Sequence, residues 1–296
     1  MKNKKTLYAD LSLIIVTIIW GAGFVVTKNV LDSITPFYML GLRSIIATVV
    51  LGLISIKKIK KMKFLDFKAG IIVGVFLFLG FATQTIGTKY TTGGNTAFIT
   101  ATNVVMVPFF YFLLTKKKLG FYEIFGAVLC FIGIGILSID SNFRIGYGDF
   151  LVLLCAVFFA MQIVAVGHFA KDVDPFIFST VQLGTMSVLS FICAFIFEPK
   201  MTQIRPEAII PILYLGLFGS MIAFLIQNIA QAHTSSTHAA IILSLEAVFG
   251  SIFSIIFLKE ALTVKFFIGC MAILVSVLAS ETKFEFLKLN IIHDGE

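Results

Sequence analysis

The chain has 296 residues, of which 58% are hydrophobic and only 13% are charged, with a formal net charge of +7. Soluble domains carry about 25% charged residues, so this composition excludes a soluble enzyme and indicates an integral membrane protein. The basic residues lie in short segments between apolar runs, which is typical of membrane topology signals and does not suggest nucleic-acid binding.

Ten apolar runs of about twenty residues follow one another along the chain, and each is long enough to cross a bilayer as a helix. The first run continues without a small-residue cleavage site, so we expect a retained helix and not a signal peptide. No connection is long enough for a soluble domain. The predicted spans are 8–28, 36–56, 67–89, 94–114, 119–139, 147–167, 176–197, 207–231, 236–258 and 263–281.

The distribution of positive charge predicts the orientation of these spans. With the N-terminus in the cytoplasm, 15 Lys and Arg residues fall on the cytoplasmic side and 7 on the other side. Because positively charged loops are retained inside, this bias predicts a multi-pass protein of the cytoplasmic membrane with both termini in the cytoplasm. Its surroundings would be the lipid bilayer.

The two halves of the chain repeat one another weakly but in constant order. The spacing from Asp10 to Asp149 is also the spacing between the prolines that open the second and seventh spans, and we call it the early offset. Further along the chain the spacing is slightly larger, as from Gln84 to Gln227, and we call it the late offset. Unrelated apolar helices would not keep such an order, so we infer an internal repeat.

The repeat has a consequence for topology. We place the first copy at residues 8–139 and the second at 147–282. Each copy holds five spans, an odd number, so the second copy is inverted in the membrane. Inverted repeats that enclose a site between them are a transporter architecture, in which one half moves against the other.

One carboxylate, Glu246, interrupts about twenty apolar residues in the ninth span. A carboxylate near the middle of such a helix costs roughly 2.5–3.5 kcal/mol, which is accepted mainly where the group faces protein or a watery cavity. The fourth span has the same layout, with Asn103 at the matching position. Glu246 would exchange a proton or bind a cationic group of a substrate. A structural hydrogen bond is the alternative for both residues.

Amide side chains recur inside the apolar spans. Gln84 lies in the third span, and Gln227 and Asn228 lie in the eighth, while Thr100 precedes Asn103 by one helical turn. Buried amides are costly unless they are hydrogen-bonded. Their recurrence at repeat-equivalent positions favours a polar-lined cavity that holds a substrate, although hydrogen bonds between helices would satisfy them too.

Aromatic residues share a face of the first span. Trp20 and Phe24 are spaced as neighbours on a helix, and the repeat-equivalent face of the sixth span carries Phe159 and Gln162. These residues would form an apolar cavity wall that stacks against a planar or cationic substrate, or simply pack the bundle. Arg43, two turns into the second span, would either attract an anion or extend toward the membrane interface.

Several stretches together carry a family resemblance: WGAGFVVTK at 20–28, PFYMLGLR at 36–43, AFITATNVVMVP at 97–108, and LSLEAVF at 243–249 followed by LKEAL at 258–262. In this order they resemble a ten-helix member of the drug/metabolite transporter superfamily of the type built from two EamA repeats. The resemblance covers about residues 8–282. It implies a secondary carrier, often an exporter, without indicating the cargo.

These observations predict an all-α polytopic membrane protein with ten transmembrane helices in two inverted five-helix repeats around a central cavity. The sequence has no GxSxG, HExxH, P-loop or CxxC pattern, so we expect no enzyme activity, cofactor or metal. We predict a secondary transporter that exports a small organic solute (a metabolite, amino acid or drug-like compound) across the cytoplasmic membrane by alternating access, driven by an ion gradient, such as that of protons, or by the solute's own gradient. A membrane scaffold or receptor, an intramembrane enzyme and a passive channel are the alternatives.

Overall fold

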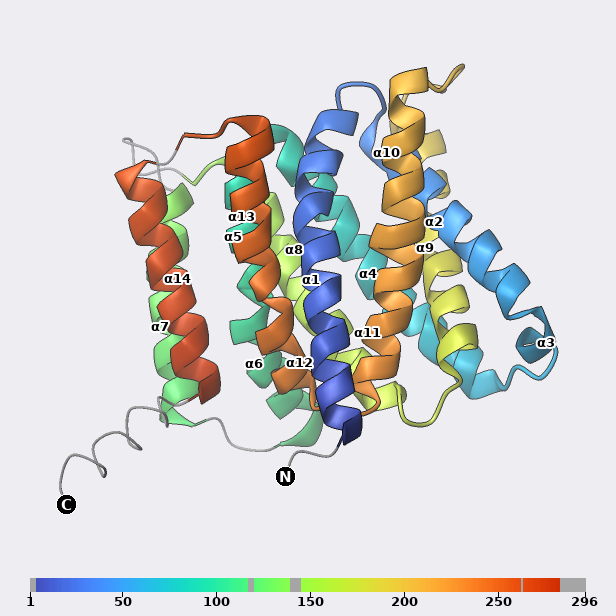
Figure 1. The fold of residues 1–296 in the computed structure, drawn as a ribbon, viewed down its shortest axis with the longest axis horizontal. Coiled ribbons are helices and arrows are strands. Elements are labelled where there is room, and N and C mark those ends of the chain that lie inside the picture. Colours follow the sequence, from blue (N-terminus) through green and yellow to red (C-terminus); the bar gives the residue numbers. More distant parts are fainter. Residues whose placement is uncertain (1–3, 117–119, 139–144, 262, 283–296) are drawn as a thin grey trace.

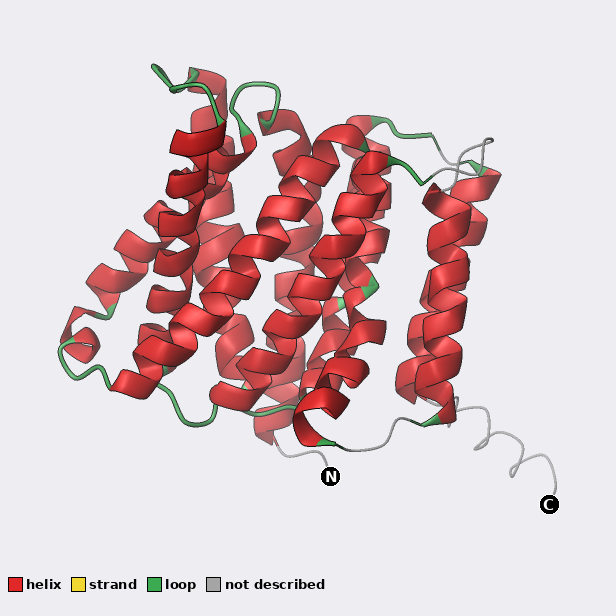
Figure 2. Cartoon of the chain, turned by 180° about the vertical axis from the view of Figure 1, so that it is seen from behind, coloured by secondary structure: helices red, strands yellow, loops and turns green. Residues whose placement is uncertain are grey.

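The computed structural model describes residues 4–116, 120–138, 145–261 and 263–282, which are almost entirely helical and contain no β-strand (Figure 1 and Figure 2). The helices are α1 (Lys4–Val30), α2 (Pro36–Ile54), α3 (Ile56–Ile59), α4 (Phe64–Tyr90), α5 (Gly93–Ala101), α6 (Asn103–Thr115), α7 (Phe121–Ser138), α8 (Tyr147–Phe169), α9 (Pro175–Phe197), α10 (Pro206–Gly216), the π-helix η1 (Leu217–Ile222), α11 (Ala223–Gln231), α12 (Ser236–Leu243), α13 (Leu245–Leu258) and α14 (Val264–Thr282).

Eight segments of the described chain are long and apolar enough to cross a membrane. They correspond to the predicted spans one to four and six to nine. The fifth and tenth spans, α7 and α14, contain shorter apolar stretches, Ile124–Ile136 and Val264–Ser276. The predicted class, an all-helical protein with many membrane spans, is confirmed.

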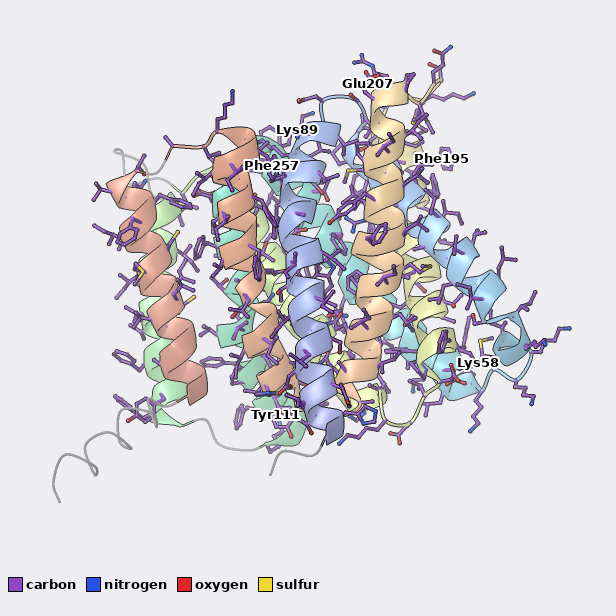
Figure 3. The ribbon with its side chains drawn as sticks, viewed as in Figure 1. Lys58, Lys89, Tyr111, Phe195, Glu207 and Phe257 are labelled. Carbon is purple, nitrogen blue, oxygen red and sulfur yellow. The ribbon has the colours of Figure 1, made fainter. Side chains whose placement is uncertain are left out.

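Large apolar side chains cover the outside of the bundle. Phe195 and Phe257 are 72% and 66% exposed and lie on its periphery (Figure 3). Charged side chains such as Lys58, Lys89 and Glu207 lie at its two ends (Figure 3). An apolar belt between charged ends is the surface that a lipid bilayer requires, because hydrocarbon cannot solvate polar groups.

Contacts between helix ends fix the relative direction of the two halves. Lys28, in the last turn of α1, donates to the carbonyls of Thr88 and Thr91 at the end of α4, both at 2.6 Å. The Thr91 hydroxyl donates to Asp149 in the first turn of α8. Helix α8 therefore begins where α1 ends and runs opposite to it. We call this side of the bundle the Val30 end and the opposite side the Lys4 end.

At the start of the second helix of each half, a carboxylate from another segment accepts hydrogen bonds. At the Val30 end, Glu198 after α9 accepts from the Thr35 hydroxyl at 2.6 Å and from the Tyr38 amide at 3.0 Å, at the start of α2. At the Lys4 end, Asp66 of α4 accepts from the Asp174 amide at 3.0 Å, at the start of α9. Negative groups are favourable at helix N-termini, so these contacts hold α2 and α9 antiparallel.

The fourth and ninth spans are each broken near the middle. Helices α5 and α6 meet at Thr102, and α12 and α13 meet at Ser244. Both hydroxyls donate to a carbonyl three residues earlier, Ile99 and Ile241, each at 2.6 Å. Such local bonds compete with the helical ladder and bend helices. The breaks place Asn103 and Glu246 in the first turns of α6 and α13.

The outer boundaries of these broken spans match at the late offset. The side chains of Thr92 and Ser235 cap α5 and α12 by accepting from the amide three residues later. At the other ends, Lys116 and Lys259 terminate α6 and α13 in the left-handed conformation, with φ of 59° and 53°. Two segments with equivalent caps and termini, each broken near its middle, form the core of the two halves.

Glycines allow the closest helix contacts. A Cβ on Gly21 of α1 would lie 2.6 Å from the Phe249 Cβ of α13, and one on Gly74 of α4 would lie 2.6 Å from the Thr185 Cβ of α9. These contacts join the first half to the second. Three apolar clusters pack the described part of the bundle, and Trp20 packs against two of them.

Candidate functional site

A cavity of about 50 Å³, which is room for a few water molecules, lies inside the bundle. Its lining comes from α1, α2, α4, α6, α8, the segment α10–η1–α11, α12 and α13. No described side chain of α7 or α14, the fifth and tenth predicted spans, belongs to the lining. Helix α2 contributes through one side chain, Arg43.

One wall of the cavity is a chain of aromatic rings. The ring centres of Trp20 and Phe224 lie 5.1 Å apart. Those of Phe224 and Phe81 lie 5.9 Å apart, and those of Phe81 and Phe159 lie 5.2 Å apart. The Trp20 indole nitrogen is fixed by donation to the Gly219 carbonyl at 3.0 Å. The four rings come from α1, α4, α8 and α11, so both halves of the chain build this wall. Phe24 of α1 also lines the cavity.

Glutamine side chains from both halves line the cavity, as the sequence predicted. Gln84 donates to the hydroxyl of Thr100 at 3.1 Å. Gln162 and Gln227 bond one another reciprocally, at 3.4 and 3.3 Å. Each of these three glutamines lies on the cavity wall. A hydrogen bond to a neighbouring side chain orients each of them. Asn103 lines the cavity too.

Glu246 lies on the cavity wall and is 6% exposed. Among the described residues, no hydrogen bond or ion pair holds its carboxyl group. The first turn of α13 favours a negative charge at this place, whereas removal from water opposes it. The repeat-equivalent Asn103 is also buried, and its Oδ1 has no hydrogen-bond partner. Both side chains therefore have free capacity toward the cavity.

Two residues expected at the site lie outside the lining. Thr100 is fully buried behind Gln84, whose amide it accepts, so it positions that side chain. Asn228 turns away from the cavity toward α9, where its amide donates to the Ser179 hydroxyl at 2.8 Å and to Gln182 Oε1 at 2.9 Å. Because Asn228 follows Gln227 directly, it points to another side of the helix.

Arg43 is the only cationic residue on the described lining, and Glu246 is the only acidic one. Arg43 is 3% exposed; its Nε donates to the Ser220 hydroxyl at 2.9 Å, and its Cζ lies 4.5 Å from the centre of the Phe81 ring. The side chain thus faces the bundle interior and does not extend to the membrane interface. Ser220 belongs to η1, and π-helical turns often occur at functional sites.

Among the described residues, the cavity lining reaches toward the Val30 end of the bundle. Thr27 and Thr88, in the last turns of α1 and α4 at the Val30 end, belong to its lining. Their repeat equivalents at the Lys4 end, Val166 and Gln231, are both 0% exposed and lie outside it. Gln231 is held by donation to the Ile163 carbonyl at 3.1 Å. Thr27 and Thr88 are themselves 9% and 1% exposed, so the two ends differ in which residues line the cavity and hardly in exposure.

Some lining residues were not found from the sequence. Phe81 and Phe224 carry no polar signal, and only their spacing, which equals the late offset, marks them as an equivalent pair. Gly219 is placed at the cavity by a π-helical turn that no sequence pattern indicated. In the described part of the chain, no cluster of three or more His, Cys, Asp or Glu side chains could hold a metal ion.

The family model described as the EamA-like transporter family matches residues 7–139 and 146–281. The chain belongs to this family. It is 37% identical over 274 residues to an uncharacterized transporter of Archaeoglobus fulgidus, which covers 93% of this chain and 86% of that protein. The uncharacterized transporter YvbV of Bacillus subtilis is 24% identical and covers 96% of this chain and 94% of its own length.

Two more distant matches extend the comparison. A WAT1-related chloroplastic protein of Arabidopsis thaliana is 24% identical, over 87% of this chain and 66% of its own length. A solved crystal structure with 17% sequence identity superimposes with a TM-score of 0.70 and covers 97% of this chain and 99% of the other, which shows a shared fold. Family membership and the apolar helices make this EamA protein a multi-pass membrane transporter, and nothing in the family or relatives' names indicates an enzyme.

Proposed function

We propose that this protein is a secondary transporter that moves a small organic solute out of the cytoplasm by alternating access, with the central cavity as its binding site. The observation that carries the proposal is a cavity between two antiparallel halves, whose described lining includes Thr27 and Thr88 near the Val30 end but not their equivalents Val166 and Gln231 near the Lys4 end. Carriers built from inverted repeats reach the opposite state when the two halves exchange their conformations. In that state the lining would reach toward the Lys4 end instead.

Orphaned polar atoms at the Lys4 end support this exchange. Gln231 Oε1, Asn228 Oδ1 and Gln182 Nε2 are buried and have no hydrogen-bond partner. Buried polar atoms without partners cost about 1–3 kcal/mol each, and native structures hold few of them. Gln182 and Gln231 stand at the positions equivalent to Arg43 and Thr88, which line the cavity now. In the opposite state these amides would face the hydrated cavity.

Glu246 is the proposed proton-coupling site. Its carboxyl group has no protein partner among the described residues, so its charge state is free to follow the cavity's contact with water. Protonation when the cavity faces one side and release when it faces the other would couple proton flow to solute movement. With both termini placed in the cytoplasm, the Val30 end faces outward, and proton entry from that side would drive export.

A reconstituted transport assay tests the proposal. A thermal-stability screen of amino acids, amines and organic acids on the purified protein selects the solute, because a bound ligand stabilises the folded state. Flux of the radiolabelled solute is then measured in proteoliposomes under an imposed pH gradient. We expect gradient-driven accumulation with the wild-type protein.

The Glu246→Gln variant keeps the size of the side chain but cannot exchange a proton, so it should lose gradient-driven accumulation. Glu207→Gln is the matched control, since Glu207 is exposed at the Val30 end of α10, away from the cavity (Figure 3). Unchanged, pH-driven flux in Glu246→Gln would remove Glu246 from the mechanism. A stabilising solute that the wild-type protein never moves would contradict transport itself.

A further inference from the structure

We propose that Arg43 is an anion-binding residue of the cavity and that the transported solute carries a carboxylate together with a cationic group. This inference rests on the proposed transport function and names the chemical class of its substrate. Arg43 lines the cavity and is 3% exposed. Among the described residues, no carboxylate lies within ion-pair distance of it.

An unpaired guanidinium is costly in this place. Arg remains charged at any physiological pH, and a charged side chain inside a membrane bundle is ordinarily paired or faces water. A purely structural Arg would be expected to bond a carboxylate or several carbonyl groups. Arg43 donates from Nε to a neutral hydroxyl, Ser220 Oγ.

The surroundings orient the guanidinium without neutralising it. Ser220 holds Nε from one side, and the Phe81 ring lies under the guanidinium plane, with 4.5 Å between Cζ and the ring centre. Gly219 is the near neighbour of Nη2, since a Cβ built on this glycine would lie 3.2 Å from that nitrogen. These contacts leave the terminal nitrogens as a fixed fork, and such a fork matches the two oxygens of a carboxylate.

The equivalent position in the second half argues against a structural requirement for the charge. Gln182, which follows Arg43 at the early offset, is a neutral amide that accepts from Asn228 at 2.9 Å. The same place in the fold is therefore built without a cation. The charge of Arg43 belongs to the cavity and not to the packing of the second and seventh spans.

Glu246 completes the recognition. It lines the same cavity, yet it makes no ion pair with Arg43, so the two opposite charges remain available to a ligand. Helix α13 packs against α1 and α5, whereas α2 packs against α9 and α10, which places the two charges on different walls. A zwitterion satisfies both groups. A simple cation would pair with Glu246 and leave Arg43 without a partner. A simple anion would pair with Arg43 and leave the Glu246 carboxylate without a partner.

The test compares matched ligands on purified full-length protein. The twenty amino acids are screened by thermal stabilisation, and each stabilising acid is compared with its carboxamide, which lacks the carboxylate, and its N-acetyl derivative, which lacks the cation. We expect the parent zwitterion to bind at least about tenfold more tightly than either derivative, because each derivative loses one charge-assisted contact. Stabilisation by amines alone, equal affinity for acid and carboxamide, or no stabilisation by any amino acid would overturn the proposal.

Variants assign the effect to Arg43. Arg43→Gln places there the residue found at the equivalent position and should weaken the zwitterion by about 10- to 100-fold, while binding of the carboxamide stays unchanged. Arg43→Lys keeps the charge but loses the fork, so its affinity for the zwitterion should fall between those of the wild-type protein and Arg43→Gln. If Arg43→Gln does not fold, Ser220→Ala tests the same fork and should weaken the zwitterion selectively. Equal loss of acid and carboxamide binding would indicate a structural role and contradict the assignment.

The same ligands separate this inference from the transport proposal. Flux of a cationic amine that is insensitive to Arg43→Gln would leave transport standing and reject the zwitterion. Arg43-dependent binding of a carboxylate without any flux in proteoliposomes would leave the anion site standing and reject transport.

Discussion

The two halves of the cavity wall agree in shape and differ in charge. Gln84 and Gln227, which define the late offset, both line the cavity and both form amide hydrogen bonds there. Asn103 and Glu246 stand at equivalent positions as well, but only the second is an acid. The fold therefore requires matching volumes and hydrogen-bonding groups in its two halves, whereas each charge is placed once.

The halves also differ in packing. Thr88 lines the cavity at the Val30 end, while the equivalent Gln231 is fully buried at the Lys4 end. A symmetric sequence plan thus gives a structure whose two ends contribute differently to the cavity lining. Charge asymmetry and packing asymmetry are separate properties, and substitutions can remove one without the other.

The largest effect is expected from making the acidic position symmetric. Glu246→Asn gives both halves the same residue and removes the only acid from the described lining. Proton-driven solute flux should fall by at least about 100-fold, which corresponds to roughly 2.7 kcal/mol of lost coupling. Flux in proteoliposomes with and without a pH gradient measures it. Asn103→Ala should reduce solute flux equally with and without the pH gradient. If that variant lost only the flux driven by the gradient, proton coupling would belong to the first half of the chain and not to Glu246.

Much of this comparison was available from the sequence. Constant offsets predicted which residues would be equivalent and marked Gln162 on the sixth-span face, and the cost of amides in apolar spans selected Gln84 and Gln227; all three line the cavity. Spacing alone did not fix helix rotation, so Asn228 was expected at the cavity although it bonds to α9. Neighbouring residues on a helix point about 100° apart, and an apolar span carries little information on which polar face turns inward.

Other features lie beyond what a pattern of residue types can specify. An Arg two turns inside a span satisfies the same pattern whether it faces lipid headgroups or the bundle, and tertiary contacts with Ser220 and Phe81 decided between them. The breaks at Thr102 and Ser244 depend on hydroxyl-to-carbonyl bonds that Thr and Ser also make in continuous helices. The aromatic pair of Phe81 and Phe224 looks like ordinary lipid-facing composition.

Packing between the halves gives the next largest effect. A Cβ on Gly80 of α4 would overlap the Phe159 ring on the cavity wall, whereas the equivalent position, Ala223, already carries a methyl group. Gly80→Ala should lower stability by about 1–3 kcal/mol through overpacking and weaken solute binding by moving that ring. Thermal midpoints in detergent and binding titrations measure both. Gly23→Ala is the matched control, because its nearest contact would be Leu215 Cδ2 at 3.9 Å; equal destabilisation by both changes would contradict the packing argument.

Accessibility of equivalent positions measures the packing asymmetry directly. In a cysteine-free background, Thr88→Cys should react with an impermeant thiol reagent faster than Gln231→Cys, by about fivefold, since only the first lines the cavity. A solute or pH gradient that drives the opposite state should reverse the ratio, which is a change of about 25-fold, or about 1.9 kcal/mol in population. Reaction of both positions from the same side at equal rates would indicate a channel open at both ends.

The smallest effect concerns a feature that both halves share, the left-handed residue that ends each broken span. Lys259 has φ of 53°, a conformation that costs a non-glycine residue roughly 1–2 kcal/mol and costs glycine little. Glycine loses more chain entropy on folding, so Lys259→Gly should raise stability by a net of only about 0.5 kcal/mol. Denaturation in mixed micelles measures the change. Lys68→Gly removes the same side chain from an exposed position inside α4 and should lower stability by about 1 kcal/mol, so the two substitutions should have opposite signs. A loss of stability in both would mean that the Lys259 side chain, and not its backbone conformation, determines how the ninth span ends.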